Sequence, residues 1–305
     1  MKTRSVFILL VLFCSSAAAQ LKIVIVERLL KAPARSWSSP RFSPDGKRVY
    51  FTTQGFNGIW EYTPAEKSLR RITDDPRSGY GFAISPDGKT IAYRRTRQQP
   101  HSLARLQELV VMDMTSKSTQ VLAQGENVSI PAFAGSAVVY SVENATNNVA
   151  ATRALSSPVL LGIEDTKIVV IERGRKRLLD PLGRGSYIWP MLSPDGKRIV
   201  ATEMARGAFI CDLRGRVVAR LGARNAAVWT RDSRWLVYME DEDDGHNVLS
   251  SDLYAVGSDG KRAARLTFTS DVREMNPHCS PTENKIVCDT LEGDILLMTY
   301  EEVSR

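Results

Sequence analysis

The chain has 305 residues, of which 43% are hydrophobic and 25% are charged, a composition typical of a globular protein. Its formal net charge is +7, but basic and acidic residues are interspersed along the sequence. This balance favours a mildly basic solvated surface and argues against a nucleic-acid-binding protein.

The first residues, "MKTRSVFILLVLFCSSAAAQ", form a basic start, a short apolar run and a group of small residues. This pattern predicts a secretory signal peptide over 1–19 and a single mature domain over 20–305. Its removal leaves 39 basic and 34 acidic residues, a net charge of +5. The apolar run is too short to span a bilayer, and no other segment is long enough. We therefore expect an exported protein that does not span the membrane, periplasmic in a Gram-negative host.

Cys14 raises the alternative of a lipoprotein, in which a lipidated cysteine becomes the first residue. The bulky Phe13 precedes it, whereas such processing prefers a small residue. The alanines at 17–19 fit ordinary cleavage better, so we expect no lipid anchor.

A turn sequence occurs three times, as "SPDGKRVY" at 43–50, "SPDGKTIA" at 85–92 and "SPDGKRIV" at 193–200. Proline presets the first turn dihedral, aspartate bonds to nearby amides and glycine tolerates a positive φ. An apolar residue precedes each serine, and a β-rich run follows each turn. Each copy therefore predicts a strand, a tight turn and a second strand.

Degenerate copies of this hairpin occur at 131–143, 229–240 and 278–290, which gives six in all. A second strand pair follows nearly every hairpin, and the 286 residues from Gln20 divide into units of about 48. Four-stranded units repeated at this period predict an all-β, six-bladed β-propeller. We read residues 144–165 as an insert in the third unit, with shorter inserts at 94–106 and 240–251. The regular period disfavours a β-sandwich or several independent domains.

The last unit lacks a fourth strand, because "DILLMTYEEV" at 294–303 supplies only a third strand. The segment "KIVIVERLL" at 22–30 precedes the first hairpin and has no hairpin of its own. An open ring would leave an exposed sheet edge. We therefore predict that 22–30 is the outermost strand of the last blade and closes the propeller.

These repeats resemble the TolB-like propeller family, whose signature is an apolar residue, Ser-Pro-Asp-Gly-Lys and then a β-rich run. The matching segments are "FSPDGKRVYF" at 42–51, "ISPDGKTIAY" at 84–93 and "LSPDGKRIVA" at 192–201. The resemblance covers essentially all of the mature chain and implies a propeller without the additional N-terminal domain of TolB. It is specific for fold and weak for function, because such repeats occur in binding proteins and beside hydrolase domains.

The sequence contains no G-x-S-x-G, phosphate-binding loop, H-E-x-x-H or C-x-x-C motif. Resemblance to the related oligogalacturonate lyases offers an enzymatic alternative with a metal site near the axis. His278 opens the innermost strand of the last unit and is the weak candidate ligand. The equivalent positions in the other units hold Arg41, Ala83, Ala132, Met191 and Val228, none of which is a good ligand. We expect His278 to be a hydrogen-bonded structural histidine.

The acidic stretch "EDEDDGHN" at 240–247 raises the possibility of a Ca²⁺ loop formed by Asp241, Asp243 and Asp244. The spacing does not match the Ca²⁺-loop motif, so we expect a solvated loop and no cofactor. Three cysteines remain after export, Cys211, Cys279 and Cys288. Cys279 and Cys288 flank one hairpin as diagonal neighbours, at or beyond disulfide reach, so all three are expected to be small buried hydrophobes.

Alternating strands place all the Ser-Pro-Asp-Gly turns on one face, and the inserts with the connections between blades on the other. Binding usually uses variable loops on a rigid scaffold. We therefore predict a non-catalytic binding module for an envelope protein or peptide. The alternatives are a metal-dependent carbohydrate-active enzyme that resembles oligogalacturonate lyase, with a carbohydrate as its partner, and a structural subunit of an envelope complex. The predicted binding residues of the connections are Trp37, Tyr80, Tyr187, Trp189, Glu274 and Asn276. Trp37, Tyr80 and Tyr187 are expected to be exposed, whereas Trp189 fits exposure and packing between blades equally well.

Overall fold

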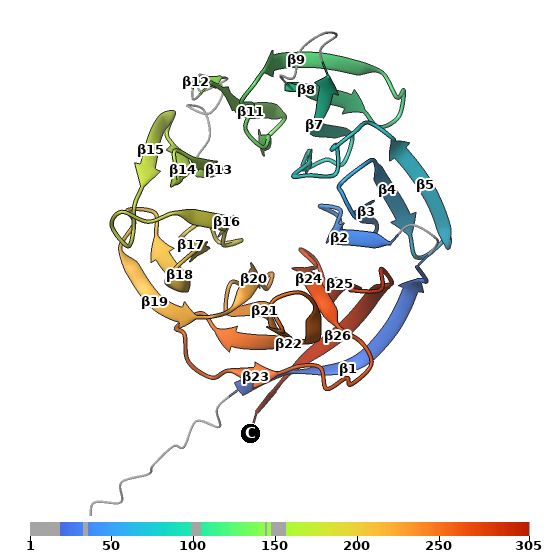
Figure 1. Ribbon diagram of the computed structural model, residues 1–305, viewed down its shortest axis with the longest axis vertical. Coiled ribbons are helices and arrows are strands. Elements are labelled where there is room, and N and C mark those ends of the chain that lie inside the picture. Colours follow the sequence, from blue (N-terminus) through green and yellow to red (C-terminus); the bar gives the residue numbers. More distant parts are fainter. Residues whose placement is uncertain (1–18, 33–35, 99–104, 144, 148–156, 305) are drawn as a thin grey trace, which may run out of the picture.

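The computed structural model describes residues 19–32, 36–98, 105–143, 145–147 and 157–304, and the predicted signal peptide lies almost entirely outside this range. The described residues form strands and turns and contain no helix, hence none that could cross a membrane. The strands form small antiparallel sheets arranged as a ring around a central axis (Figure 1). The predicted all-β propeller is confirmed.

Four sheets follow the expected order, in which strands run from the axis to the periphery in chain order. The first two consist of β2 (Trp37–Phe42), β3 (Val49–Thr53), β4 (Ile59–Thr63) and β5 (Ser68–Thr73), then β6 (Ala83–Ile84), β7 (Thr90–Gln98), β8 (Arg105–Asp113) and β9 (Thr119–Gly125). The others consist of β16 (Tyr187–Leu192), β17 (Arg198–Glu203), β18 (Gly207–Asp212) and β19 (Val217–Gly222), then β20 (Asn225–Trp229), β21 (Trp235–Asp243), β22 (Val248–Gly257) and β23 (Ala264–Arg265).

The last sheet joins the two ends of the described chain. It consists of β24 (Glu274–Cys279), β25 (Lys285–Thr290), β26 (Ile295–Ser304) and β1 (Ala19–Leu30), with β1 outermost. β1 pairs antiparallel with β26 from Ala19 opposite Ser304 to Leu30 opposite Ile295. The prediction that the segment 22–30 closes the ring as the outermost strand is confirmed.

The third predicted unit forms two sheets in place of one. The described residues therefore contain seven sheets, whereas the sequence predicts six blades. One three-stranded sheet contains β10 (Ala132–Ala134), β11 (Ala137–Val142) and β12 (Ala145–Asn147), and the next contains β13 (Val159–Glu164), β14 (Lys167–Glu172) and β15 (Arg175–Leu179). The turn between β13 and β14 uses Asp165 and Thr166, both at positive φ, where a glycine would mark a turn in the sequence. The supposed insert at 144–165 therefore contains two strands without the repeat signature, β12 and β13.

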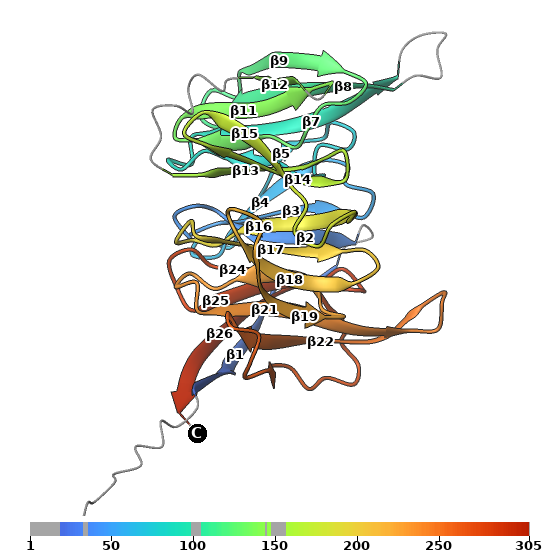
Figure 2. The same cartoon turned by 90° about the vertical axis from the view of Figure 1, so that its left-hand side faces the viewer.

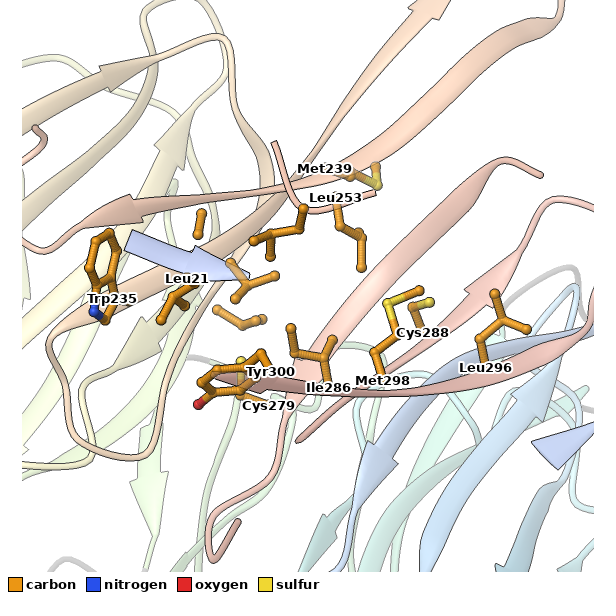
Figure 3. Packing of buried hydrophobic residues seen from close by; sticks show 14 residues of the cluster. Leu21, Trp235, Met239, Leu253, Cys279, Ile286, Cys288, Leu296, Met298 and Tyr300 are labelled. Carbon is orange, nitrogen blue, oxygen red and sulfur yellow. The ribbon is translucent and has the colours of Figure 1, made fainter. Parts of the chain in front are cut away.

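The hydrophobic core lies between neighbouring sheets. One cluster places Leu21 of β1 with Trp235, Ile286 and Tyr300, which belong to the last two sheets (Figure 3). Similar clusters of buried side chains join the other neighbouring sheets around the ring. Each sheet therefore buries both of its faces against its neighbours.

The three cysteines Cys211, Cys279 and Cys288 are free and buried, as expected. Burial raises the pKa of all three thiols, which keeps them protonated and unreactive at neutral pH. They contribute to the packed core as small apolar side chains.

The two faces of the ring have different connections. The Ser-Pro-Asp-Gly turns and the turns between third and fourth strands share one face, which we call the turn face. In the second sheet, Ser85 Oγ donates to Asp87 Oδ1 over 2.6 Å, and the backbone N–H of Lys89 donates to the same oxygen over 3.0 Å. Gly88 has a φ of +70°, which glycine adopts without a steric penalty. These bonds fix the register of the two strands.

The opposite face, which we call the rim face, carries the connections between sheets and the turns between second and third strands. These two kinds of connection are bonded to one another. For example, the Gly79 N–H donates to the Phe56 carbonyl, and the Met204 N–H to the Ser186 carbonyl. The long hairpins β7–β8 and β21–β22 extend beyond the ring on the same side (Figure 2).

Ring closure by β1 gives a first test. Replacing Leu21, which is 2% exposed, with alanine should lower the free energy of unfolding by about 2–4 kcal/mol, because a buried leucine loses contacts and leaves a cavity. Val26→Ala on the same strand, at a side chain 55% exposed, is the control and should change it by less than about 0.5 kcal/mol. Chemical denaturation measures both. Equal stabilities of the two variants would contradict closure through β1.

Candidate functional site

The candidate site is the mouth of the axial channel on the rim face, where the innermost strands begin. Four of these strands, β2, β16, β20 and β24, contain a bulge that interrupts pairing with the second strand. Each bulge holds a residue with a positive φ, namely Ser39, Trp189, Ala226 and Asn276, at 54°, 51°, 50° and 47°. The same backbone distortion therefore recurs around the axis.

Proline explains three of these bulges. Pro40, Pro190 and Pro277 each follow the positive-φ residue directly. Because proline has no N–H to donate, it breaks the ladder and is tolerated at an edge strand or a bulge. Left-handed backbone at residues other than glycine is strained and tends to occur at functional positions. The bulged residues do not pair with the second strand and lie on the innermost strand, beside the channel.

Three of the predicted binding residues are buried, and they lie in strands rather than connections. Trp37, Tyr187 and Glu274 occupy the first position of β2, β16 and β24, with exposed fractions of 7%, 1% and 1%. These equivalent positions face the neighbouring sheet, so the side chains pack between sheets. The small Ser and Gly residues beside them in the sequence suggest open loops instead. The expected exposure of Trp37 and Tyr187 is wrong.

The partners of these three side chains are structural. Trp37 packs its ring against Phe51 and Trp60, with centroids 5.0 and 5.3 Å away. The Tyr187 hydroxyl donates to Asp180 Oδ1 over 2.7 Å and accepts from the Leu182 N–H over 2.8 Å.

Glu274 accepts a hydrogen bond from Thr269 Oγ1 at 3.0 Å. Burial raises its pKa to about 7, and nearby Asp252 adds to the effect. These contacts and the buried position indicate that Glu274 holds the last connection against the sheet.

Tyr80 is exposed, as expected, with 46% of its surface accessible on the connection between the first two sheets. Its ring stands edge-on to Phe56 at 5.1 Å, and the Arg94 guanidinium lies 5.4 Å from its centroid. Arg94 is held in turn by the Val128 carbonyl, which accepts a hydrogen bond from Nη1 at 2.5 Å. A cation over an aromatic face is attracted to the ring. Tyr80 is therefore an aromatic group in a fixed position on the rim.

Trp189 and Asn276 lie at equivalent bulge positions. Trp189 is 54% exposed. Of the two possibilities left open by the sequence, exposure and packing between blades, the structure therefore shows exposure. Because β16 is the innermost strand of its sheet, the indole lies beside the channel or its mouth. Asn276 is partly buried and donates from Nδ2 to Asp289 Oδ2 over 3.2 Å. The same bulge therefore holds an apolar side chain, Trp189, in β16 and a polar side chain, Asn276, in β24.

Asp289 is a polar group that the sequence patterns do not single out. It lies on β25, is 4% exposed, and its Oδ1 has no hydrogen-bond partner. Burial raises the pKa of its carboxyl group to about 7. The Asn276 amide stabilises the charged form only in part. Asp289 is buried because it lies on β25 beside the bulge of β24, and this burial raises its pKa. The sequence alone does not show that burial.

His278, the weak candidate for a metal ligand, lies near the positively charged side chain of Arg41. Its Nδ1 accepts a hydrogen bond from the Phe42 N–H at 3.3 Å. Desolvation and the nearby Arg41 charge lower its pKa to about 3, so the imidazole is neutral at physiological pH. Within the described residues, no group of three or more His, Cys, Asp or Glu side chains is placed to hold a metal ion.

The acidic residues form the end of the β21–β22 hairpin. Asp241 Oδ1 accepts from Asn225 Nδ2 at 2.8 Å. Asp243 and Asp244 accept backbone N–H groups of the turn, including that of Gly245 at 2.8 Å. The hairpin uses these carboxylates to fix its turn. The expectation of a solvated loop that binds no cofactor stays a prediction.

Exposed large apolar side chains on the rim face extend beyond the predicted residues. Six of them belong to that face: Tyr80, Ile130, Trp189, Met204, Leu249 and Phe268. Phe268 has the largest exposed fraction, 75%, with the Arg265 guanidinium 4.9 Å from its ring centroid. The other exposed large apolar residues are on outermost strands: Val24, Ile25, Val26, Leu69, Val121, Leu178 and Val218. Among the residues that the structure describes, the turn face has none.

The arrangement is similar to solved propeller structures. TolB from Acinetobacter baumannii matches with a TM-score of 0.54 and 17% identity, over 81% of this chain and 58% of that one. The fold is a β-propeller similar to that of TolB. An oligogalacturonate lyase from Vibrio parahaemolyticus matches with a TM-score of 0.51 and 14% identity, over 87% of this chain and 78% of that one.

An oligogalacturonate lyase in complex with manganese matches with a TM-score of 0.52 and 16% identity, over 88% of this chain and 78% of that one. No family model and no curated protein matches the sequence. At these identities the similarity concerns the fold alone. The chain spans 58% of the TolB structure. A shared fold does not transfer the activity or partners of any of these neighbours to this chain.

The contrast between buried and exposed aromatics gives a test. Tyr187→Ala should lower the free energy of unfolding by about 3–5 kcal/mol, because it leaves a cavity and removes the hydrogen bonds of the Tyr187 hydroxyl to Asp180 and Leu182. Tyr80→Ala should cost less than about 1 kcal/mol, because the ring is half exposed. Thermal and chemical denaturation of both variants check this. A stable Tyr187→Ala variant would contradict the structural role of Tyr187.

Asp289 gives a second test through pH. Its pKa rises from about 4 in the unfolded chain to about 7 in the fold, so the wild type loses stability as pH increases through this interval. Asp289→Asn should be more stable than the wild type at pH 8, by about 1–3 kcal/mol. The advantage should disappear near pH 4, where the wild-type carboxyl group is protonated. An advantage independent of pH would rule out titration of Asp289 as its cause.

Proposed function

We propose that this protein is an exported, non-catalytic binding propeller that holds a protein or peptide partner on its rim face. The observation that carries the proposal is the distribution of exposed apolar side chains. Apart from the outermost strands, these groups are found on the rim face and not in the described part of the turn face. Single exposed apolar side chains are common on folded proteins, whereas their grouping on one face is a feature of interaction sites.

The residue types support a protein or peptide partner. Tyr80 and Trp189 supply aromatic surface, and Tyr and Trp are enriched among residues that contribute most to binding energy. Met204, on the turn between β17 and β18, and Leu249, near the start of β22, add flexible apolar groups on the same face. The bulges and the cation above Tyr80 hold the aromatics in place, so less entropy is lost on binding.

The enzymatic alternative receives less support from the geometry. A metal-dependent lyase would use His278, whose Nδ1 accepts the Phe42 N–H and whose neighbour Arg41 repels a cation. Export and a periplasmic location follow from the leader pattern of residues 1–19 and remain part of the proposal.

Affinity capture with paired variants tests the rim face. Purified wild type and Tyr80→Ala/Trp189→Ala should be incubated with envelope extract of the host, and retained proteins quantified by mass spectrometry. A partner enriched by the wild type should fall by about tenfold or more with the double variant, because two aromatic contacts are lost.

Leu69→Ala/Val218→Ala is the matched control, because it removes exposed apolar side chains from the outermost strands β5 and β19. This variant should retain the partner at the wild-type level, and all three proteins should have similar melting temperatures. If the rim variant also retains the partner, binding uses another surface and the proposal fails.

A further inference from the structure

An open cavity of about 830 Å³ lies between the sheet of β13–β15 and the sheet of β16–β19, on the turn face, opposite the proposed partner surface. Three turns form it: the β14–β15 turn, the Ser-Pro-Asp-Gly turn after β16 and the β18–β19 turn. Its size is in the range of small-ligand sites. The sequence presents these turns as separate charged loops, and only the fold brings them together.

The cavity is lined mainly by basic side chains. Arg173 and Arg175 come from the first turn, Lys197 from the second and Arg214 from the third, and Arg177 completes the set. The first four form no ion pair within the part of the chain that the structure describes, although elsewhere most arginines of the surface do. Their positive charges are therefore available to a ligand.

The two acidic residues of the lining are already neutralised. Glu172 accepts from Arg177 Nη2 at 2.9 Å. Asp212 accepts from Arg216 Nε at 2.7 Å and from the backbone N–H groups of Arg214 and Arg216. The net charge that the cavity presents is consequently positive.

The walls are fixed before a ligand binds. Arg177 Nη2 also donates to the Leu213 carbonyl over 2.7 Å, which ties the β14–β15 hairpin to the β18–β19 turn. Arg173 and Gly174 adopt φ angles of 51° and 72°, and Gly215 adopts 83°, so both turns are tight. Fixed walls reduce the entropy lost when a ligand is held.

We propose that this cavity binds a ligand with two or more phosphate groups. A guanidinium group can donate two parallel N–H groups to the oxygens of one phosphate. The three arginines and one lysine that form no ion pair within the described residues carry more positive charge than one carboxylate of a ligand would neutralise. The phosphates belong either to a soluble compound or to the headgroups of an anionic lipid surface. This site goes beyond the proposed function, because it uses the other face and none of the rim residues.

Binding of inorganic tripolyphosphate to the full-length mature protein tests the site, measured by calorimetry at physiological ionic strength. The wild type should bind it, and Arg175→Gln/Arg214→Gln should bind about tenfold or more weakly, because two charge-assisted contacts are lost. Lys197→Gln changes the third wall alone and should weaken binding by a few-fold. Since all three side chains are exposed, the variants should melt like the wild type.

Lys22→Gln/Arg220→Gln is the control of equal charge, located on the outermost strands β1 and β19. It should bind tripolyphosphate like the wild type. An equal loss in the control would show that only overall charge matters, and no loss in the Arg175/Arg214 variant would show that the cavity is not used. Either result, or no binding by the wild type, overturns the proposal.

Competition experiments distinguish the two sources of phosphate. Vesicles of phosphatidylcholine with phosphatidic acid should displace tripolyphosphate if the site faces a membrane surface, while pure phosphatidylcholine vesicles should not. If neither vesicle competes while the cavity variants still lose tripolyphosphate binding, the site takes a soluble phosphate compound.

Discussion

The pairing of β1 with β26 is the interaction on which the ring depends. Each sheet buries its two faces against neighbours, so the first and last sheets are stable only if the ring closes. The chain supplies the closing strand from its other end, and Leu21 places an apolar side chain in the core between the last two sheets. Without this pairing, β26 would present an open edge. The rigid framework that holds every turn in position follows from this closure.

Closure also separates the two faces of the molecule. Strands alternate in direction, so all turns after first strands are on one side, and the connections between sheets are on the other. The faces then acquire different chemistry: exposed aromatic and aliphatic groups on the rim face, and an arginine-lined cavity on the turn face. A ring with two unlike faces can hold two ligands of different chemistry without competition between them.

The innermost strands show how local chemistry shapes the candidate site. Proline in an inner strand removes a donor from the ladder, and the resulting bulge exposes Trp189 at one sheet and orients Asn276 toward Asp289 at another. The same device therefore gives an exposed aromatic in one place and a buried polar contact in another.

Much of the fold could be predicted from the sequence because its signals are local. The Ser-Pro-Asp-Gly turns, the alternating strands and the unpaired segment 22–30 are sufficient to predict a propeller closed by its N-terminal strand. The division of the third unit into two sheets could not be predicted, because the turn at Asp165 and Thr166 takes a positive φ without glycine.

The site depended more on tertiary structure. Tyr80 and Tyr187 both stand next to small residues in the sequence, but one is exposed and the other is buried beside Asp180. Exposure is set by the neighbouring sheet, which is distant in the sequence. The cavity is a similar case, since Arg175 and Arg214 belong to different sheets. The sequence by itself determined the strands and turns, and the ring decided which side chains meet, because burial and charge clustering arise only between sheets.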